Sequence, residues 1–339
     1  MSVLYLHTAP KPNLPGTDAV FQESEILRSR FGGNELVIYP FLNPSSYLPR
    51  FLYGWHKFLE IGKFQKEIAL NHVFSPGLFH YPILKILKKP IVYSVTATLR
   101  DEDLERPLTS FRSLANILVN SERDRRKLSD RGFENVVQVP PVVNVESLKP
   151  GPVPDGQQFI LLMASAPWEA NQFDSKGINL LLRAVKEAPW LKLVLLWRGR
   201  LMEELQNRIQ KEDVREQVEV IDELVNIQEV MDRVHATVLL AKTGEIVKSF
   251  PHSLVESVAC AKPVVISDTI AMSDYVKNFG CGLVLKRFDL PSLLPILEQL
   301  RNDYSVFREA AERVGGSSFS SEHVLEKIGQ VYHQINPDL

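Results

Sequence analysis

The sequence predicts an α/β protein built from two domains, each with a parallel β-sheet. Short apolar runs rich in Val, Ile and Leu alternate along the chain with segments of helical period, as expected for successive β-α units. The runs are nearly continuous rather than interrupted at every second residue, which is typical of strands covered on both faces. The length of 339 residues exceeds that of one ordinary domain and fits two.

In the first half of the chain, six apolar runs predict strands and the segments between them predict helices. These elements together indicate an N-terminal domain over residues 1–145. Strands are expected at 3–6, 35–41, 72–75, 90–95, 117–121 and 135–139, and helices at 18–31, 46–60, 78–88, 108–115 and 122–131.

The amino-acid composition changes between residues 138 and 158, where the chain has five prolines and two glycines. Proline lacks an amide donor and disfavours helix at the residue before it, so we expect a linker, assigned to 146–158. A second domain is expected over 159–318 and a final helical segment over 319–339. Its strands are expected at 159–164, 191–197, 218–221, 236–241, 263–267 and 282–285, and its helices at 176–188, 201–211, 227–234, 253–260, 271–278, 289–302, 304–314 and 321–335.

Composition argues against several classes of protein. Apolar residues make up 45% and charged residues 24%, as in soluble globular chains. The balance of 39 basic against 41 acidic side chains gives no sign of a nucleic-acid binder. Cys260 and Cys281 have no metal-ligand spacing and fit a reducing cytoplasm. The chain shows no signal-peptide pattern and no run of ~18 apolar residues, so we expect a cytoplasmic protein.

The loop after the strand at 236–241 leads into a helix whose start has a phosphate-binding pattern. The first amides of a helix are unpaired and carry the positive end of its dipole, so the amides of Ser253 and Leu254 can bind a phosphate. Glu256 can accept hydrogen bonds from a pair of hydroxyls. The spacing Ser-x-x-Glu is also that of a capping box, in which both side chains serve only the helix. The spacing alone leaves both interpretations open.

Residues 46–66 interleave aromatic and basic side chains, and residues 50–89 contain seven Lys or Arg against two Asp or Glu. Such a segment can lie on an anionic membrane surface, where lipid-linked acceptors are found. The alternative is that its aromatic side chains pack into the N-terminal domain, as amphipathic helices of soluble proteins usually do. The residues expected to contact a membrane or an acceptor are Trp55, Lys57, Phe58 and Lys63.

Several motifs of the second half occur together in one known family. The segment F-P-H-S-L-V-E-S-V-A-C-A-K-P-V-V-I-S-D (250–268), followed by D-Y-V-K-N-F-G-C-G-L-V-L (274–285), resembles the donor-binding segment of the group 1, or family 4, retaining glycosyltransferases. S-K-G-I-N-L-L-L-R-A (175–184) is similar to their K-G-x-x-x-L-L-x-A motif. A looser likeness covers N-S-E-R-D-R-R-K-L-S-D-R-G-F and V-P-P-V-V-N-V in the first half. The resemblance implies the GT-B fold: two Rossmann-like domains with a nucleotide sugar bound between them, and a final helix that crosses back onto the first.

The resemblance also implies roles for individual residues. Lys176 matches the lysine that contacts the donor pyrophosphate, and Glu256 matches the glutamate that binds the ribose. The amides of Ser253 and Leu254 match the helix start that receives the distal phosphate. Gly16 stands in place of the glycine-rich loop after the first strand, although a glycine there also suits a turn. No cofactor and no metal are implied, because no Asp-x-Asp motif has the right context and Lys176 with the helix dipole can stabilise the leaving diphosphate.

Two positions depart from the family pattern in the half of the site that holds the sugar. Lys248 stands where a glutamate usually contacts the transferred sugar, and Thr96 stands where a histidine commonly follows the fourth strand. One hypothesis is that Lys248 binds a carboxylate or phosphate on the donor or acceptor. Another is that catalysis has been lost while the fold is kept. The sequence identifies no catalytic base.

The sequence therefore predicts a cytoplasmic, peripherally membrane-bound enzyme of polysaccharide biosynthesis. It would transfer a hexosyl group from a nucleotide diphosphate sugar to a hydroxyl of a glycan or lipid-linked glycan, with retention of configuration. The alternative is a catalytically inactive glycosyltransferase-like subunit that binds an acceptor or an active partner. An epimerase-like sugar-nucleotide enzyme fits the motifs less well. The expected partners are the nucleotide sugar, the acceptor and an anionic membrane surface, with no nucleic acid.

Overall fold

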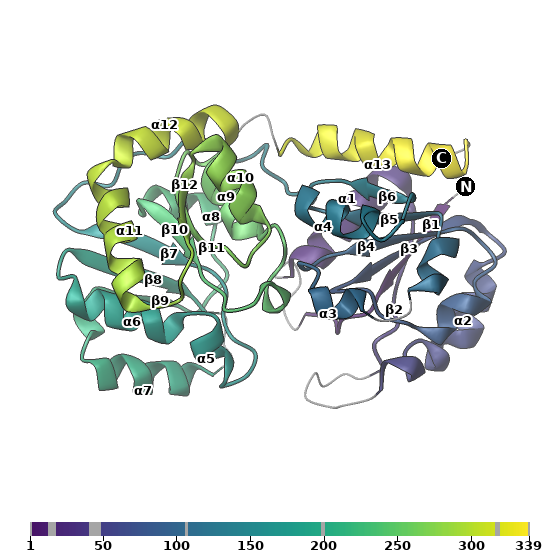
Figure 1. Cartoon of the computed structure of the whole chain (residues 1–339), viewed down its shortest axis with the longest axis horizontal. Helices are drawn as coiled ribbons and strands as arrows, with labels where there is room; N and C mark the ends of the chain where they lie inside the picture. Colours follow the sequence, from purple (N-terminus) through teal and green to yellow (C-terminus); the bar gives the residue numbers. More distant parts are fainter. Residues whose placement is uncertain are drawn as a thin grey trace. The chain divides into compact units, whose positions relative to one another are not determined.

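The computed structural model describes residues 2–12, 18–40, 49–105, 108–197, 201–315 and 319–337. The chain divides into two compact units. Unit 1 comprises residues 1–143, 248–250 and 321–339, and unit 2 comprises residues 144–247 and 251–320. Within the described residues, each unit contains one six-stranded parallel sheet flanked by helices (Figure 1). The predicted α/β fold class with two parallel sheets is confirmed.

The sheet of unit 1 has the strand order β2-β1-β3-β4-β5-β6. The topological switch point of this sheet lies between β1 and β3, because the chain places successive strands on opposite sides of it. Open parallel sheets bind ligands beside the loops that follow the two strands at such a point. The strands are β1 (Ser2–His7), β2 (Gly33–Val37), β3 (Ile68–Ser75), β4 (Ile91–Val95), β5 (Asn116–Val119) and β6 (Val136–Gln138).

Helices cover both faces of this sheet, which explains why its strands are continuously apolar. Along β1, Val3 and Tyr5 pack into one apolar cluster with α1 (Ala19–Phe31) and α13 (Ser321–Ile335). Leu4 and Leu6 point into a second cluster on the other face. The elements on that face are α2 (Phe58–Phe64), α3 (Asp101–Leu104), α4 (Glu122–Ser129) and the 3₁₀ turns η3 (Pro82–Ile86) and η4 (Thr109–Ser113).

The last helix, α13, is held to the sheet of unit 1 by a buried polar chain. The hydroxyl of Tyr332 lies 2.5 Å from Nδ1 of His72 on β3, and Nε2 of His72 lies 2.7 Å from the hydroxyl of Ser94 on β4. Burial lowers the pKa of His72 to about 3, so the imidazole is neutral at physiological pH. These contacts join the last helix of the chain to strands β3 and β4 of the same unit.

The sheet of unit 2 has the order β12-β11-β10-β7-β8-β9, so its topological switch point lies between β7 and β10. Helices α6 (Ile178–Glu187) and α11 (Leu290–Asn302) pack on one face, and helix α8 (Ile227–Asp232) packs on the other. The strands are β7 (Phe159–Met163), β8 (Leu191–Leu196), β9 (Val218–Ile221), β10 (Ala236–Leu239), β11 (Val264–Ser267) and β12 (Gly282–Leu285). The helices are α5 (Gln172–Ser175), α6 (Ile178–Glu187), α7 (Met202–Glu212), α8 (Ile227–Asp232), α9 (His252–Ala259), α10 (Met272–Phe279), α11 (Leu290–Asn302) and α12 (Tyr304–Gly315), with the 3₁₀ turns η5 (Arg215–Gln217) and η6 (Gly244–Ile246).

The proline-rich segment expected as a linker is fastened to unit 2. The amide of Gly151 donates to the carbonyl of Cys260 at 3.0 Å, and the guanidinium of Arg308 donates to the carbonyl of Gly151 at 3.1 Å. The ammonium of Lys262, whose side chain is fully buried, donates to the carbonyl of Pro152. The segment is therefore an ordered part of unit 2 rather than a free tether.

Three helices predicted in the first half are wrong in type or extent. Over 49–64 the chain forms two 3₁₀ turns, η1 (Arg50–Leu52) and η2 (Trp55–Lys57), before the short α2. Gly54 separates the turns with a φ of 86°, and a Cβ there would lie 2.8 Å from Ile83, so the helix cannot run through. The helices expected at 78–88 and 108–115 are the 3₁₀ turns η3 and η4.

Candidate functional site

The candidate site of unit 2 lies where the order of its strands reverses. Strands β7 and β10 are neighbours in the sheet, and both end at the same edge because they are parallel. Lys176 follows β7 along the chain, while helix α9 follows β10. Open parallel sheets bind ligands at this kind of edge, outside the carboxyl ends of the strands. The topology therefore brings the predicted residues of two distant motifs to one edge.

Lys176 is a buried cation whose contacts are with neutral groups. Only 5% of the residue is exposed, and its ammonium donates to the carbonyl of Ala166 at 3.0 Å and to the hydroxyl of Ser165 at 3.4 Å. Burial lowers its pKa to about 8, with no contribution from a carboxylate. Within the described part of the chain, Lys176 has no acidic partner. An ammonium held in this way at the ligand edge of a sheet is suited to an anionic ligand.

The glycine after Lys176 fixes the position of this lysine. Gly177 has a φ of 75°, and a Cβ at this position would lie 2.7 Å from the side chain of Leu240, which follows β10. The amide of Lys242 donates to the carbonyl of Ser175 at 2.8 Å. These two contacts lock the loop after β10 against the start of α6. The Lys-Gly pair of the sequence therefore has a clear local cause: only glycine fits beside the lysine.

Helix α9 begins one residue earlier than predicted, and this overturns the capping-box interpretation. Its N-cap is Pro251 rather than Ser253, and no side chain caps the helix. The amides of Leu254 and Val255 both donate to the carbonyl of Pro251, at 3.1 and 3.2 Å. Ser253 is the second helical residue, where an amide has no partner inside the helix. Of the two amides predicted to receive phosphate, that of Leu254 is thus already engaged, while Glu256 lies half-buried one turn into the helix.

Lys248 belongs to unit 1, and its charge has a partner there. Its ammonium lies 3.8 Å from a carboxylate oxygen of Glu23 on α1, and the two side chains are only 18% and 9% exposed. Burial lowers the pKa of Lys248 and raises that of Glu23, and each partner opposes the shift of the other. A lysine at this position is accordingly explained by the carboxylate that faces it, without a charged substrate.

Thr96 also has a structural role in unit 1. Its amide and hydroxyl both donate to the carbonyl of Ser75, at 2.8 and 3.3 Å. The carbonyl of Thr96 accepts the amide of Ser249 at 3.2 Å, and Ala97 forms an antiparallel bridge with Lys248. These bonds hold residues 248–250 on the ends of β3 and β4.

The remaining predicted residues lie elsewhere. Gly16 lies outside the described residues, and Trp55, Lys57, Phe58 and Lys63 lie in unit 1 along η2 and α2. Sequence reasoning missed Glu23, because no local pattern links it to Lys248.

Among the described residues, no group of three or more His, Cys, Asp or Glu could hold a metal ion. No helix of the described chain is long and apolar enough to cross a membrane.

One known family matches part of the chain. Residues 158–314 match the family described as glycosyl transferases group 1. This part of the chain is a group 1 glycosyltransferase domain. The match covers Lys176 and the whole of α9. No curated protein matches the chain significantly.

Solved glycosyltransferase structures share the fold of the whole chain. HepE of Anabaena, in complex with UDP and glucose, has 14% identity and a TM-score of 0.72, over 97% of this chain and 98% of HepE. A glycosyltransferase from Rickettsia africae has 12% identity and a TM-score of 0.74, over 98% of each chain. WaaG, a glycosyltransferase involved in lipopolysaccharide biosynthesis, has 14% identity and a TM-score of 0.67, over 98% of this chain and 99% of WaaG. At such identities the likeness establishes the fold, which is GT-B.

Proposed function

We propose that this glycosyltransferase binds a nucleoside diphosphate sugar at the β7 and β10 edge of unit 2. It transfers the hexosyl group, with retention of configuration, to a hydroxyl of a glycan or lipid-linked glycan. The observation that carries the proposal is the buried ammonium of Lys176, whose contacts among the residues that the structure describes are with neutral oxygens. A diphosphate would supply the missing negative charge.

The proposed chemistry follows from how charge develops on the donor. When the bond between the sugar and the diphosphate breaks, negative charge grows on the leaving phosphate oxygens. Lys176 and the first amides of α9, including that of Ser253, would stabilise this charge, since both are fixed in place before reaction. Glu256 would accept hydrogen bonds from the ribose hydroxyls. In this arrangement no metal ion is needed to stabilise the leaving group.

Uridine is the first base to test, because HepE has been solved in complex with UDP and glucose. A second candidate function is a subunit that has lost catalysis. It is favoured by the two departures from the family pattern: Lys248 pairs with Glu23, and the hydroxyl of Thr96 donates to a backbone carbonyl. Such a subunit would retain nucleotide binding without transferring sugar.

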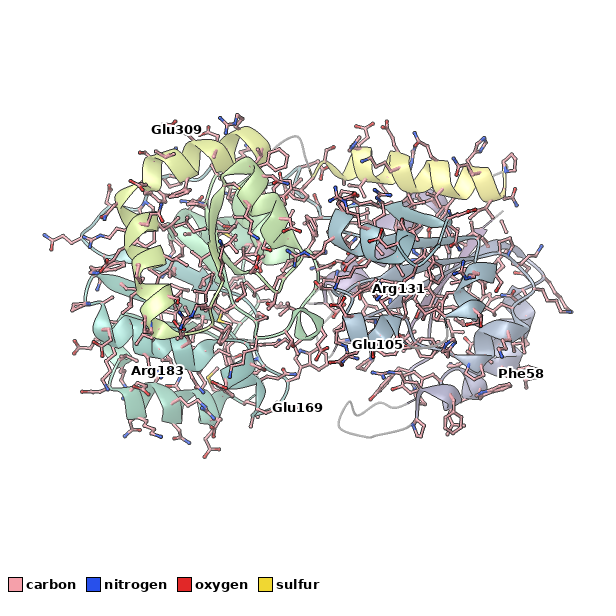
Figure 2. All side chains as sticks on the ribbon, viewed as in Figure 1. Phe58, Glu105, Arg131, Glu169, Arg183 and Glu309 are labelled. Atoms are coloured by element: carbon pink, nitrogen blue, oxygen red, sulfur yellow. The ribbon has the colours of Figure 1, made fainter. Side chains whose placement is uncertain are left out.

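Calorimetric titration of UDP, GDP and ADP into the wild type and into Glu256→Ala tests the donor site. We expect one nucleotide to bind the wild type and to bind Glu256→Ala at least tenfold more weakly, as expected for loss of a hydrogen-bonded charged group. Glu309→Ala is the matched control, since Glu309 is an exposed glutamate of α12 (Figure 2). No binding to the wild type would refute the donor site. Nucleotide binding without turnover of any donor sugar would favour the inactive subunit.

A further inference from the structure

Unit 1 carries an exposed apolar ridge formed by Phe51, Leu52, Trp55, Phe58 and Leu59. Among the described residues, ten large apolar side chains are exposed, and five of them fall within these nine positions. Leu59 is 77% exposed and Phe51 is 56% exposed. The ridge is ordered: the indole of Trp55 donates to the carbonyl of Phe51 at 3.0 Å and stacks with Phe58 at 6.2 Å. Scattered apolar residues are ordinary on a protein surface, but such a concentration marks an interaction site.

The ridge is exposed because of how its segment folds. Ile61 is the buried anchor of α2, whereas Phe58, labelled in Figure 2, is 46% exposed. The left-handed Gly54, packed on Ile83, turns the chain between η1 and η2. The break that prevented the predicted long helix therefore also keeps several aromatic side chains out of the core. Packing of these side chains into the domain, the alternative expected from the sequence, is not what the structure shows.

Basic residues lie on the same segment as the ridge and on a second segment that contacts it at the end of α2. The side chain of Gln65, at the end of α2, accepts the amides of Lys88 and Lys89 at 3.0 and 3.3 Å, so these lysines lie beside that helix. The guanidinium of Arg50 lies 3.7 Å from the ring centre of Phe79. One of the two acidic residues, Glu60, is neutralised by Lys57 at 2.8 Å. The exposed basic residues of this surface are Arg50, Lys63, Lys66, Lys85 and Lys88.

We propose that this surface, residues 50–66 with 79–89, docks onto an anionic lipid bilayer. A protein partner would also cover apolar side chains, but the local excess of seven basic over two acidic residues, in a chain of net charge −2, favours a surface rich in negative charge. Tryptophan and phenylalanine insert at the level of the lipid head groups, while each nearby lysine or arginine adds about 1 kcal/mol of attraction to anionic lipid. The inference deepens the proposed function, since a lipid-linked acceptor would be met at this face.

Flotation of the full chain with vesicles tests the docking surface. We expect binding to vesicles of one-third phosphatidylglycerol in phosphatidylcholine, and weak binding to pure phosphatidylcholine. Two variants should each reduce binding roughly tenfold or more: Trp55→Ala with Phe58→Ala and Leu59→Ala, and Lys63→Glu with Lys66→Glu. High salt should weaken the interaction, because the attraction between exposed charges is screened.

Matched controls separate this inference from the proposed function. Leu224→Ala with Val306→Ala removes equally exposed apolar side chains from unit 2, and Lys211→Glu with Arg313→Glu reverses two exposed charges there. These controls should bind vesicles like the wild type. All variants should keep the thermal midpoint and nucleotide affinity of the wild type, so that a failed donor site would not affect the result. Wild-type protein that does not float, ridge variants that float normally, or a dimer that the ridge variants dissociate would overturn the proposal.

Discussion

Two lysines with little exposed surface, Lys176 in unit 2 and Lys248 in unit 1, differ in what compensates their charge. Lys248 faces the carboxylate of Glu23 at 3.8 Å. Within the described residues, Lys176 has only a hydroxyl and a carbonyl as partners, and burial lowers its pKa to about 8. A buried charge that a protein has already paired contributes to the fold, whereas one left with neutral partners weakens the fold unless a ligand binds. The difference assigns Lys248 to structure and Lys176 to function.

The largest expected effect comes from removing the charge of Lys176. Lys176→Met should lower the affinity for the nucleoside diphosphate by about 100-fold, since a charge-assisted contact with phosphate is lost. The free energy of unfolding of the unliganded protein should rise, by about 1 kcal/mol, because a desolvated charge is removed. Calorimetry and urea unfolding measure the two quantities. Lys242→Met is the control, as Lys242 is half-exposed and pairs with Asp174.

A loss of stability in Lys176→Met without loss of nucleotide affinity would reverse the comparison. Lys176 would then be a structural lysine, and the donor site would have to lie elsewhere in the chain.

The second-largest expected effect is a loss of stability when the charge of Lys248 is removed, the opposite of the gain expected at Lys176. Lys248→Met leaves the carboxylate of Glu23 buried without its cation, so the free energy of unfolding should fall by about 2 kcal/mol. Glu23→Gln in the same chain should restore most of this loss, because a neutral amide is cheaper to bury than a carboxylate. Chemical unfolding of both single variants and of the double variant gives the coupling energy. A coupling energy near zero would mean that the pair contributes nothing to the fold.

The third prediction concerns how stability and nucleotide affinity depend on pH, and it distinguishes Lys176 from the other ionisable groups. Its folded pKa of about 8 lies below the ordinary value near 10.4, so the unfolded chain binds more protons between pH 8 and 10. The contribution of Lys176 to the stability of the unliganded protein should therefore rise over this range, while nucleotide affinity should fall by up to about tenfold per pH unit. Lys262, whose pKa burial also lowers to about 8, contributes to stability with the same sign. The affinity profile should therefore flatten in Lys176→Met, whereas the stability profile should keep the part due to Lys262.

Patterns local in the sequence predicted most of the fold and part of the site. The apolar runs located the strands because both faces of each sheet are covered, and the Lys-Gly pair located Lys176 because Gly177 is required by the close approach of Leu240. The pair of Lys248 with Glu23 was missed, because the two residues meet only through the tertiary fold. The exposed ridge was predicted on a helix, yet Gly54 divides that segment into turns.

The smallest expected effect tests the start of α9, which should share its ligand with Lys176. Because Pro251 is the N-cap, Ser253→Ala should change the free energy of unfolding by less than about 0.5 kcal/mol, whereas a capping serine would cost about 1 kcal/mol. Asp289→Ala provides the comparison in the same unit, since the side chain of Asp289 caps α11 by accepting the amide of Ser292 at 2.9 Å. Urea unfolding should place the two variants about 1 kcal/mol apart. Equal losses would restore the capping box and remove the reason to assign this helix start to a phosphate, leaving Lys176 as the single anion contact argued from the structure.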